Sequence, residues 1–210
     1  MQTNDFFTVI RERRSVRHYN PDHTIPRQEL EEILSQAILA PSSSNLQPWR
    51  FLVIDDPALK EKLLPIAWNQ QQVVQASAVI AVLGDVEAYK NAENIYQRAV
   101  AAGYMSEEVK QTLVNNISQT YGNAGLDMLK KIAYIDGGLV SMQLMLVAKA
   151  KGYDTVPMGG YDAEKFKAAF EVPENYVPIM LIALGKAAQP GHPTVRLSVE
   201  EVAYWNQFSK

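Results

Sequence analysis

The stretch from about residue 124 to residue 150 limits the fold more than any other part of the chain. Its pattern is helical, and its centre is apolar nearly all round, with Leu139, Val140, Met142 and Met145 on different sides. A helix that is apolar on every side has to be buried on every side. Because a single small monomer offers few such places, we expect a central helix that also meets a second subunit.

The rest of the chain shows shorter helical and strand patterns. We expect helices at residues 5–12, from Pro26 to Pro41 and at 87–118, the last with a break near Gly103 and Ser106, and strands at 50–54, 78–83 and 179–184. The strand segments are short apolar runs, which suits a sheet covered on both faces. With 210 residues and no linker or repeat, the chain is expected to form a single domain over residues 1–210.

Residues 186–210 form a tail with little regular pattern, because Pro190, Gly191 and Pro193 interrupt it. A tail of this kind is usually disordered unless it docks on a folded surface. Its end nevertheless carries aromatic side chains such as Trp205. These side chains favour docking.

Composition and charge exclude several kinds of function. The chain has no cysteine, so it can form neither a disulfide framework nor a cysteine-ligated metal site, and any redox chemistry has to come from a cofactor. The formal net charge of −3 provides no large positive field for a nucleic acid. The three histidines lack the spacing of metal ligands, no G-x-G-x-x-G follows a strand, and no G-x-S-x-G occurs.

We also expect neither secretion nor membrane insertion. The amino terminus lacks a basic region followed by an apolar core, which favours a cytoplasmic protein. The uncharged residues 63–84 are interrupted by Pro65 and by a polar run at 69–72, so we do not expect them to span a membrane. The apolar residues 137–148 are fewer than the roughly 20 that a membrane span needs.

Three segments carry polar groups that could bind a ligand. The first, Arg13 to Arg17, is a basic cluster with a hydroxyl group. Arginine suits a phosphate because its planar guanidinium group donates two hydrogen bonds. A solvated charged face is nevertheless the more common explanation of such a cluster. The second, Pro41 to Trp49, is either a ligand loop or a plain connection. The third contains Gly159-Gly160, which either lets a backbone approach a flat ligand or marks an ordinary turn.

Taken in order, these segments resemble the FMN-dependent nitroreductase family. The resemblance rests on Arg-Arg-Ser-Val-Arg, then Ala-Pro-Ser-Ser-Ser-Asn-Leu-Gln-Pro-Trp-Arg-Phe, then Pro-Met-Gly-Gly, then an arginine near the end, and it spans nearly the whole chain. It implies an α+β fold, a three-layer α-β-α sandwich with a central mixed sheet. It also implies an intertwined homodimer in which the tail, residues 186–210, crosses to the other subunit.

The family pattern implies a set of FMN contacts. It assigns the first motif to the phosphate and ring, the serine-rich loop to the flavin of the other subunit, and the remaining positions to the ring edge and the phosphate. The residues carried over are Arg13, Arg14, Ser15 and Arg17; Pro41, Ser42, Ser43, Asn45 and, nearby, Gln47; Asn69; Gly159 and Gly160; and Arg196. Thr194 stands where many members have lysine, so phosphate binding would rest on arginine.

The resemblance also implies an activity. NADPH or NADH would reduce FMN, leave, and be replaced by a nitroaromatic, quinone or similar acceptor in a ping-pong scheme. Arg17 would stabilise the reduced flavin, and residues 86–123 would cover the pocket. A narrower reduction such as reductive dehalogenation is an alternative within the family. Two further classes of protein stay open, namely a non-catalytic flavin-binding protein and a dimerisation domain without a cofactor.

Overall fold

The computed structural model describes residues 5–208. Residues 1–4 and 209–210, which the predicted domain 1–210 and the predicted tail 186–210 include, lie outside the described part. Along the chain the elements are α1 (Phe6–Glu12), α2 (Arg27–Ala37), η1 (Ser43–Asn45), β1 (Trp49–Ile54), α3 (Pro57–Leu63), α4 (Gln72–Gln75), β2 (Ala78–Asp85), η2 (Ala88–Asn91), α5 (Ala92–Ala101), α6 (Glu107–Gly122), α7 (Leu126–Ala150), β3 (Asp154–Met158), α8 (Ala163–Ala169), β4 (Tyr176–Gly185) and α9 (Val199–Val202).

The sheet has four strands in the order β1-β2-β4-β3, and each neighbouring pair is antiparallel. All three strands expected from apolar runs are present, and β4 begins three residues earlier, at Tyr176. Among the described residues the only parallel pairing is an isolated bridge between Ser15 and Thr155, outside the named strands. The mixed character that the resemblance implied is therefore confined in this chain to that bridge.

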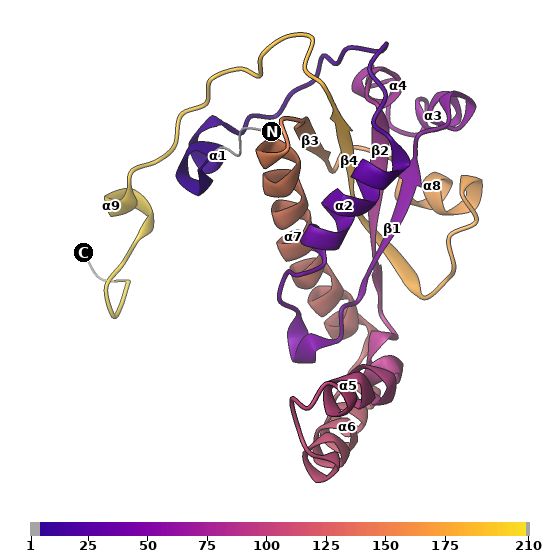
Figure 1. Cartoon of the computed structure of the whole chain (residues 1–210), viewed down its shortest axis with the longest axis vertical. Coiled ribbons are helices and arrows are strands. Elements are labelled where there is room, and N and C mark those ends of the chain that lie inside the picture. Colours follow the sequence, from indigo (N-terminus) through magenta and orange to yellow (C-terminus); the bar gives the residue numbers. More distant parts are fainter. Residues whose placement is uncertain (1–4, 209–210) are drawn as a thin grey trace.

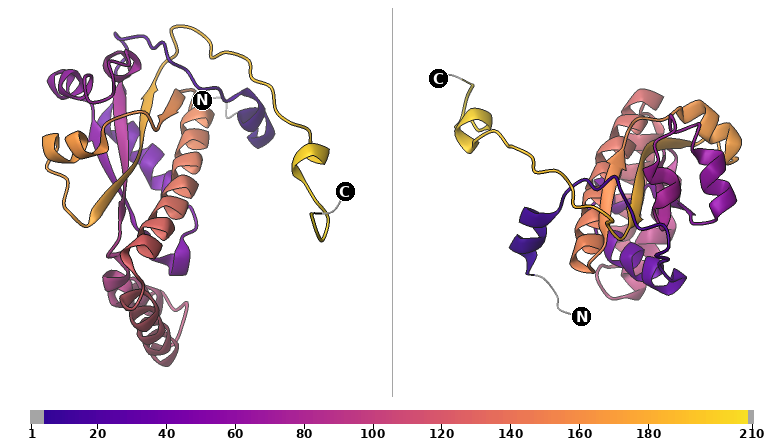
Figure 2. Two further views of the ribbon diagram at one scale, coloured as in Figure 1. Left: turned by 180° about the vertical axis from the view of Figure 1, so that it is seen from behind. Right: turned by 90° about the horizontal axis from the view of Figure 1, so that it is seen from above.

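Helices cover both faces of the sheet, as Figures 1 and 2 show. Successive residues of β2 point to opposite faces, as in any strand. Ala78, Ile80 and Val82 pack with α2 and α7, whereas the residues between them pack with α3, α4 and α8. This arrangement confirms the three-layer α-β-α sandwich and explains why the strand is apolar without alternation.

The long helix α7 is buried on one side only. Val140 and Leu144 are fully buried against β2 and β4, but Leu139 and Met142 on other sides remain 44% and 39% exposed. Within one chain the burial is incomplete, because the sheet, α1 and α2 cover only part of the helix. Cover of the exposed side by a second subunit stays a prediction. The helix α7 is longer than the apolar run 137–148 and could cross a membrane by length and composition alone. In the structure, however, its inner side is part of the domain core.

Helices α5 and α6 form a hairpin that projects from one end of the sheet (Figure 1). The predicted break is confirmed: α5 ends at Ala101, Gly103 has a φ of +76°, and the Ser106 side chain accepts a hydrogen bond from the Val109 amide at 3.3 Å to begin α6. The buried Lys110 ammonium pairs with the carboxylates of Glu93 and Glu107 and so ties the two helices together.

The tail leaves the end of β4 and extends away from the body of the domain, with α9 near its end (Figures 1 and 2). The side chains of Val195 and Trp205 are 94% and 83% exposed. Docking of this aromatic end does not occur within one chain. Its crossing to another subunit stays a prediction.

Candidate cofactor site

The arginine segment follows α1 as an extended chain beside the edge strand β3. The Val16 amide donates to the Thr155 carbonyl at 3.1 Å, and the side chains of Val16 and Tyr19 are buried in the core. Beside the inward-facing Val16, the side chains of Ser15 and Arg17 turn outward from the core. The buried Val16 and Tyr19 on either side of Arg17 are thus what holds the basic cluster on this edge.

The start of the tail returns to the same place. The Ala188 amide donates to the His18 carbonyl at 2.9 Å, and a Cβ at Gly191 would lie 2.5 Å from the Cβ of Arg14, so the close approach requires glycine. Arg196 lies near Arg13. Burial, followed by the charges of Arg196 and Arg14, lowers the pKa of the Arg13 guanidinium.

Within the described residues these arginines have no ion-paired counter-ion. None of the ion pairs among residues 5–208 involves Arg13, Arg14, Arg17 or Arg196; the hydrogen bonds of their guanidinium groups go to backbone carbonyls. Several positive charges held together without an ion-paired carboxylate form a local site for an anion. The structure therefore brings together the basic residues that the sequence had placed far apart.

The glycine loop lies further along the same strand. Gly159 and Gly160 follow the last residue of β3, and the Gln70 amide donates to the Gly160 carbonyl at 2.8 Å. A Cβ at Gly160 would lie 2.9 Å from the Trp68 ring, whereas a Cβ at Gly159 would meet nothing within 4 Å. Gly159 thus has open space above it, and Asn69, next to Trp68, has an exposed side chain.

The serine-rich loop occupies a different part of the chain. Its hydrogen bonds run to α5, α6 and α7: the Tyr96 hydroxyl donates to the Ser44 carbonyl at 3.0 Å, and the Ser44 and Tyr121 hydroxyls lie 2.9 Å apart. In Figure 1 this loop lies between α2 and β1, beside the half of α7 that is farther from β3. Within one chain the structure does not bring Pro41, Ser42, Ser43, Asn45 or Gln47 to the arginines.

Backbone strain singles out the serine-rich loop and the segment between α3 and α4 that contacts the glycine loop. Five of the seven non-glycine residues with positive φ between residues 5 and 208 belong to them, namely Ser44, Asn45, Gln47, Trp68 and Asn69. Each such residue costs on the order of 1–3 kcal/mol, and these conformations cluster where function requires them. The geometry thus agrees with the sequence in marking both loops.

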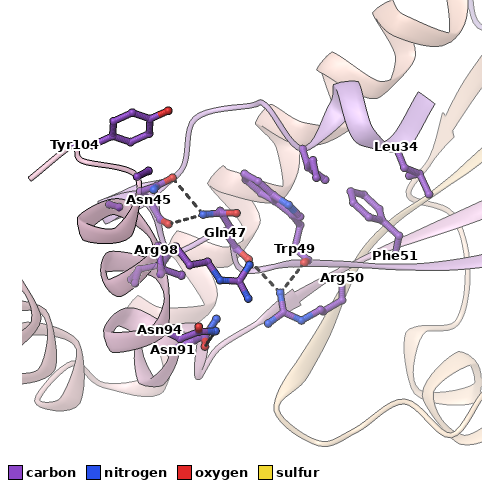
Figure 3. Close-up of a pocket in the computed structure, with 15 residues that line it drawn as sticks. Leu34, Asn45, Gln47, Trp49, Arg50, Phe51, Asn91, Asn94, Arg98 and Tyr104 are labelled. Carbon is purple, nitrogen blue, oxygen red and sulfur yellow. Dashed lines mark hydrogen bonds between the residues drawn. The ribbon is translucent and has the colours of Figure 1, made fainter. Parts of the chain in front are cut away.

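An open cavity of about 830 Å³ lies beside the serine-rich loop, between β1 and α5 (Figure 3). Asn45 and Gln47 line it together with Asn94 and Arg98 of α5. Arg50, which sequence reasoning did not single out, donates to the Gln47 carbonyl at 3.1 Å and so fixes one wall. Residues from the 86–123 segment therefore border this loop.

Sequence reasoning also missed Asp136 and Gln70. Asp136 of α7 is 1% exposed and accepts hydrogen bonds from the Ser43 amide and hydroxyl at 3.0 and 3.1 Å. It is the only charged residue between positions 132 and 148, which is a signal that could have found it. Gln70 could not be separated from its neighbouring glutamines without the contact to Gly160.

Comparisons with known proteins agree on one family. A family model described as "Nitroreductase family" matches residues 10–186. The chain is 48% identical over 207 residues, covering 98% of this chain and 99% of the relative, to the Bacillus subtilis protein named "Putative NAD(P)H nitroreductase YdgI". It is also 38% identical to the CLA biosynthesis enone reductase of Lactiplantibacillus plantarum, covering 91% and 90% of the two chains.

Among solved structures, a protein from Exiguobacterium sibiricum described as a "putative nitroreductase in complex with FMN" superimposes with a TM-score of 0.94. It is 48% identical, and the match covers 98% of this chain and 99% of that one.

Proposed function

Because this chain belongs to the nitroreductase family, we propose that it transfers a hydride from NAD(P)H through bound FMN to nitroaromatic, quinone or similar electrophilic acceptors by a ping-pong mechanism. It is an NAD(P)H-dependent FMN oxidoreductase that acts on small molecules. The observation that carries the proposal is the cluster of arginines, which have no ion-pair partner among residues 5–208 and share the edge of β3 with the open space at Gly159.

The phosphate end of FMN fits the basic cluster. Arg13, Arg14 and Arg196 provide guanidinium groups near one another, and Ser15 adds a hydroxyl on the outward side of the segment. A dianionic phosphate would relieve the repulsion among these cations, because it supplies the negative charge that the protein lacks there. We propose that these four residues hold the phosphate.

The ring end fits the glycine loop. From Thr155, which bridges to Ser15, to Gly159 the extended chain runs about 13 Å at a rise of ~3.3 Å per residue, which leaves room for an elongated ligand along the strand. Gly159 leaves space for a flat ring to approach its backbone. We propose that Gly159, Gly160 and the Asn69 side chain border the ring.

The serine-rich loop would reach the flavin from a second subunit. An apolar groove of about 600 Å³ runs between α1 and α7; its walls include Phe6, Pro41, Leu139 and Met142. A partner seated in this groove would bury the exposed side of α7, and it would lie against Pro41 at the start of the loop. We therefore propose a homodimer in which Ser42, Ser43, Asn45 and Gln47 face the partner's cofactor, with residues 186–210 as the exchanged tail.

The chemistry divides between cofactor and chain. When bound, FMN accepts a hydride and delivers it to the acceptor. The chain binds and orients the ring, and Arg17 opposes the negative charge that accumulates on its pyrimidine side after reduction. No side chain is required as a nucleophile. We propose that donor and acceptor use the same pocket in turn, and that the enzyme works in the cytoplasm.

One measurement tests the proposal: the visible absorption spectrum of the purified protein before and after anaerobic addition of NADPH and then NADH, with the released cofactor identified by chromatography. FMN that bleaches supports the oxidoreductase and shows the preferred donor. FMN that neither nucleotide reduces indicates a non-catalytic flavin-binding protein. No flavin, even after reconstitution with FMN, refutes the proposal. Initial rates that fit only a ternary-complex law would exclude the ping-pong scheme.

A further inference from the structure

We propose that Asp136 is a positioning residue for the cofactor: from the core of α7 it holds Ser43 and thereby fixes the serine-rich loop, Pro41 to Gln47, in the conformation that presents Asn45 and Gln47 to the flavin. The inference rests on the proposed function, because it gives the loop a ligand to face.

The contact itself is unusual for a helix that packs in an apolar core. Both carboxylate oxygens of Asp136 are used, Oδ2 by the Ser43 amide at 3.0 Å and Oδ1 by the Ser43 hydroxyl at 3.1 Å. No cation pairs with Asp136 in the described part of the chain. Burial raises the pKa of this carboxyl, while the two hydrogen bonds from Ser43 act in the opposite direction.

Such a group is a poor way to stabilise a fold. Burying a carboxylate without a cation costs free energy that hydrogen bonds recover only in part, whereas an apolar side chain in the same place would cost nothing of the kind. The neighbours of Asp136 on α7 are largely apolar. The carboxylate is therefore better explained by its hydrogen bonds to the serine-rich loop than by the packing of α7.

What it holds is a strained loop. Ser43 begins the single turn η1, and the next two residues, Ser44 and Asn45, have φ values of +47° and +49°. Gln47 has a φ of +48°, and its amide donates to the Ser42 hydroxyl at 3.0 Å. Strained residues persist only when their surroundings over-determine them. Asp136 supplies the only contact from a charged side chain among the described hydrogen bonds of Ser42, Ser43 and Ser44.

The experiment compares FMN binding by apoprotein variants, using quenching of FMN fluorescence, with thermal unfolding of the same apoproteins. The variants are Asp136→Ala, Asp136→Asn, Ser43→Ala and the double variant Ser43→Ala/Asp136→Ala. Ser141→Ala is the matched control, because Ser141 is equally buried on α7 and its hydroxyl has no hydrogen-bond partner among the described residues.

We expect Asp136→Ala to weaken FMN binding by at least about tenfold, the effect of losing one hydrogen bond to a charged group. Ser43→Ala keeps the amide contact and should weaken it by roughly threefold, with Asp136→Asn between the two. Ser43→Ala should have a smaller effect in the Asp136→Ala background than in the wild type, because part of its effect is the loss of the contact with Asp136. Ser141→Ala should bind FMN like the wild type.

A purely structural role predicts a different pattern. FMN affinity would then be unchanged in every Asp136 variant that folds, with changes only in thermal stability, and this result would overturn the inference while leaving the proposed function intact. If Asp136→Ala does not fold, Asp136→Asn decides the question in the same way. A wild-type protein that binds no FMN would overturn the proposed function and the inference together.

Discussion

The basic cluster beside β3 leads to the sharpest prediction, since removal of one arginine should affect the free and the bound protein in opposite directions. In the free protein Arg13, Arg14 and Arg196 repel one another, because none of the ion pairs among residues 5–208 gives them a carboxylate partner. In the complex the phosphate of FMN should turn this repulsion into attraction. Arg196→Ala should therefore weaken FMN binding without lowering the stability of the apoprotein.

The magnitude depends on exposure. A hydrogen bond to a charged group is worth about 1.5–3 kcal/mol, and solvent and salt reduce this for an exposed side chain. Arg196 is exposed, so its removal should cost about 1–2 kcal/mol, or roughly 5- to 30-fold in FMN affinity. Arg13 is half-buried, and Arg13→Ala should cost about 2–3 kcal/mol, or roughly 30- to 150-fold.

The assay is a titration of apoprotein with FMN and, separately, with riboflavin, which has the same ring but no phosphate. Both variants should lose affinity for FMN and keep the wild-type affinity for riboflavin. Arg27→Ala is the matched control, because it removes an exposed arginine that pairs with Glu31 on α2, away from the cluster. Equal losses for the two ligands would refute the assignment of the cluster to the phosphate.

Three further predictions concern the ring, its redox potential and the subunit interface. Gly160→Ala should displace the Trp68 ring, which a Cβ would approach to 2.9 Å, and lower turnover roughly tenfold in a steady-state NAD(P)H oxidation assay. Gly125→Ala, where a Cβ would meet nothing within 4 Å, is the control, and equal rates for the two variants would contradict this geometry. Arg17→Ala should lower the flavin potential by roughly 20 mV, equivalent to about 1 kcal/mol for two electrons, in a dye-equilibration titration, whereas an unchanged potential excludes an electrostatic role. Met142→Lys places a charge in the apolar groove of α7 and should produce monomers in sedimentation velocity; an intact dimer would exclude this face as the interface.

The sequence was a reliable guide where one residue pattern has one physical solution. The uninterrupted apolar run of β2 requires cover on both sides, and α2, α3, α4, α7 and α8 provide it. The break between α5 and α6 follows from Gly103 and the Ser106 cap, which act locally. The order of the arginine, serine-rich and glycine motifs was enough to identify the family.

Sequence was a poor guide where the outcome depends on segments that meet only in the folded chain. It predicted burial on every side of α7, but in one chain the sheet, α1 and α2 cover only part of the helix, so Leu139 and Met142 stay exposed and the rest of the prediction depends on a second subunit. Only the fold shows that Gln70 is bonded to Gly160, and the flavin contact predicted for Asn69 stays a prediction.

Local chemistry along the chain determined the elements, the two-sided sheet and the residue types suited to a phosphate and a flat ring. The tertiary structure decided which of these groups share a site, because contacts between distant residues depend on strand order and on register. It set Arg13 near Arg196 and aligned Ser15 with Thr155, and it joined Ser43 to Asp136. None of these pairings can be read from spacing, since each joins residues more than ninety positions apart, and a strand slipped by one residue would turn every side chain to the other face.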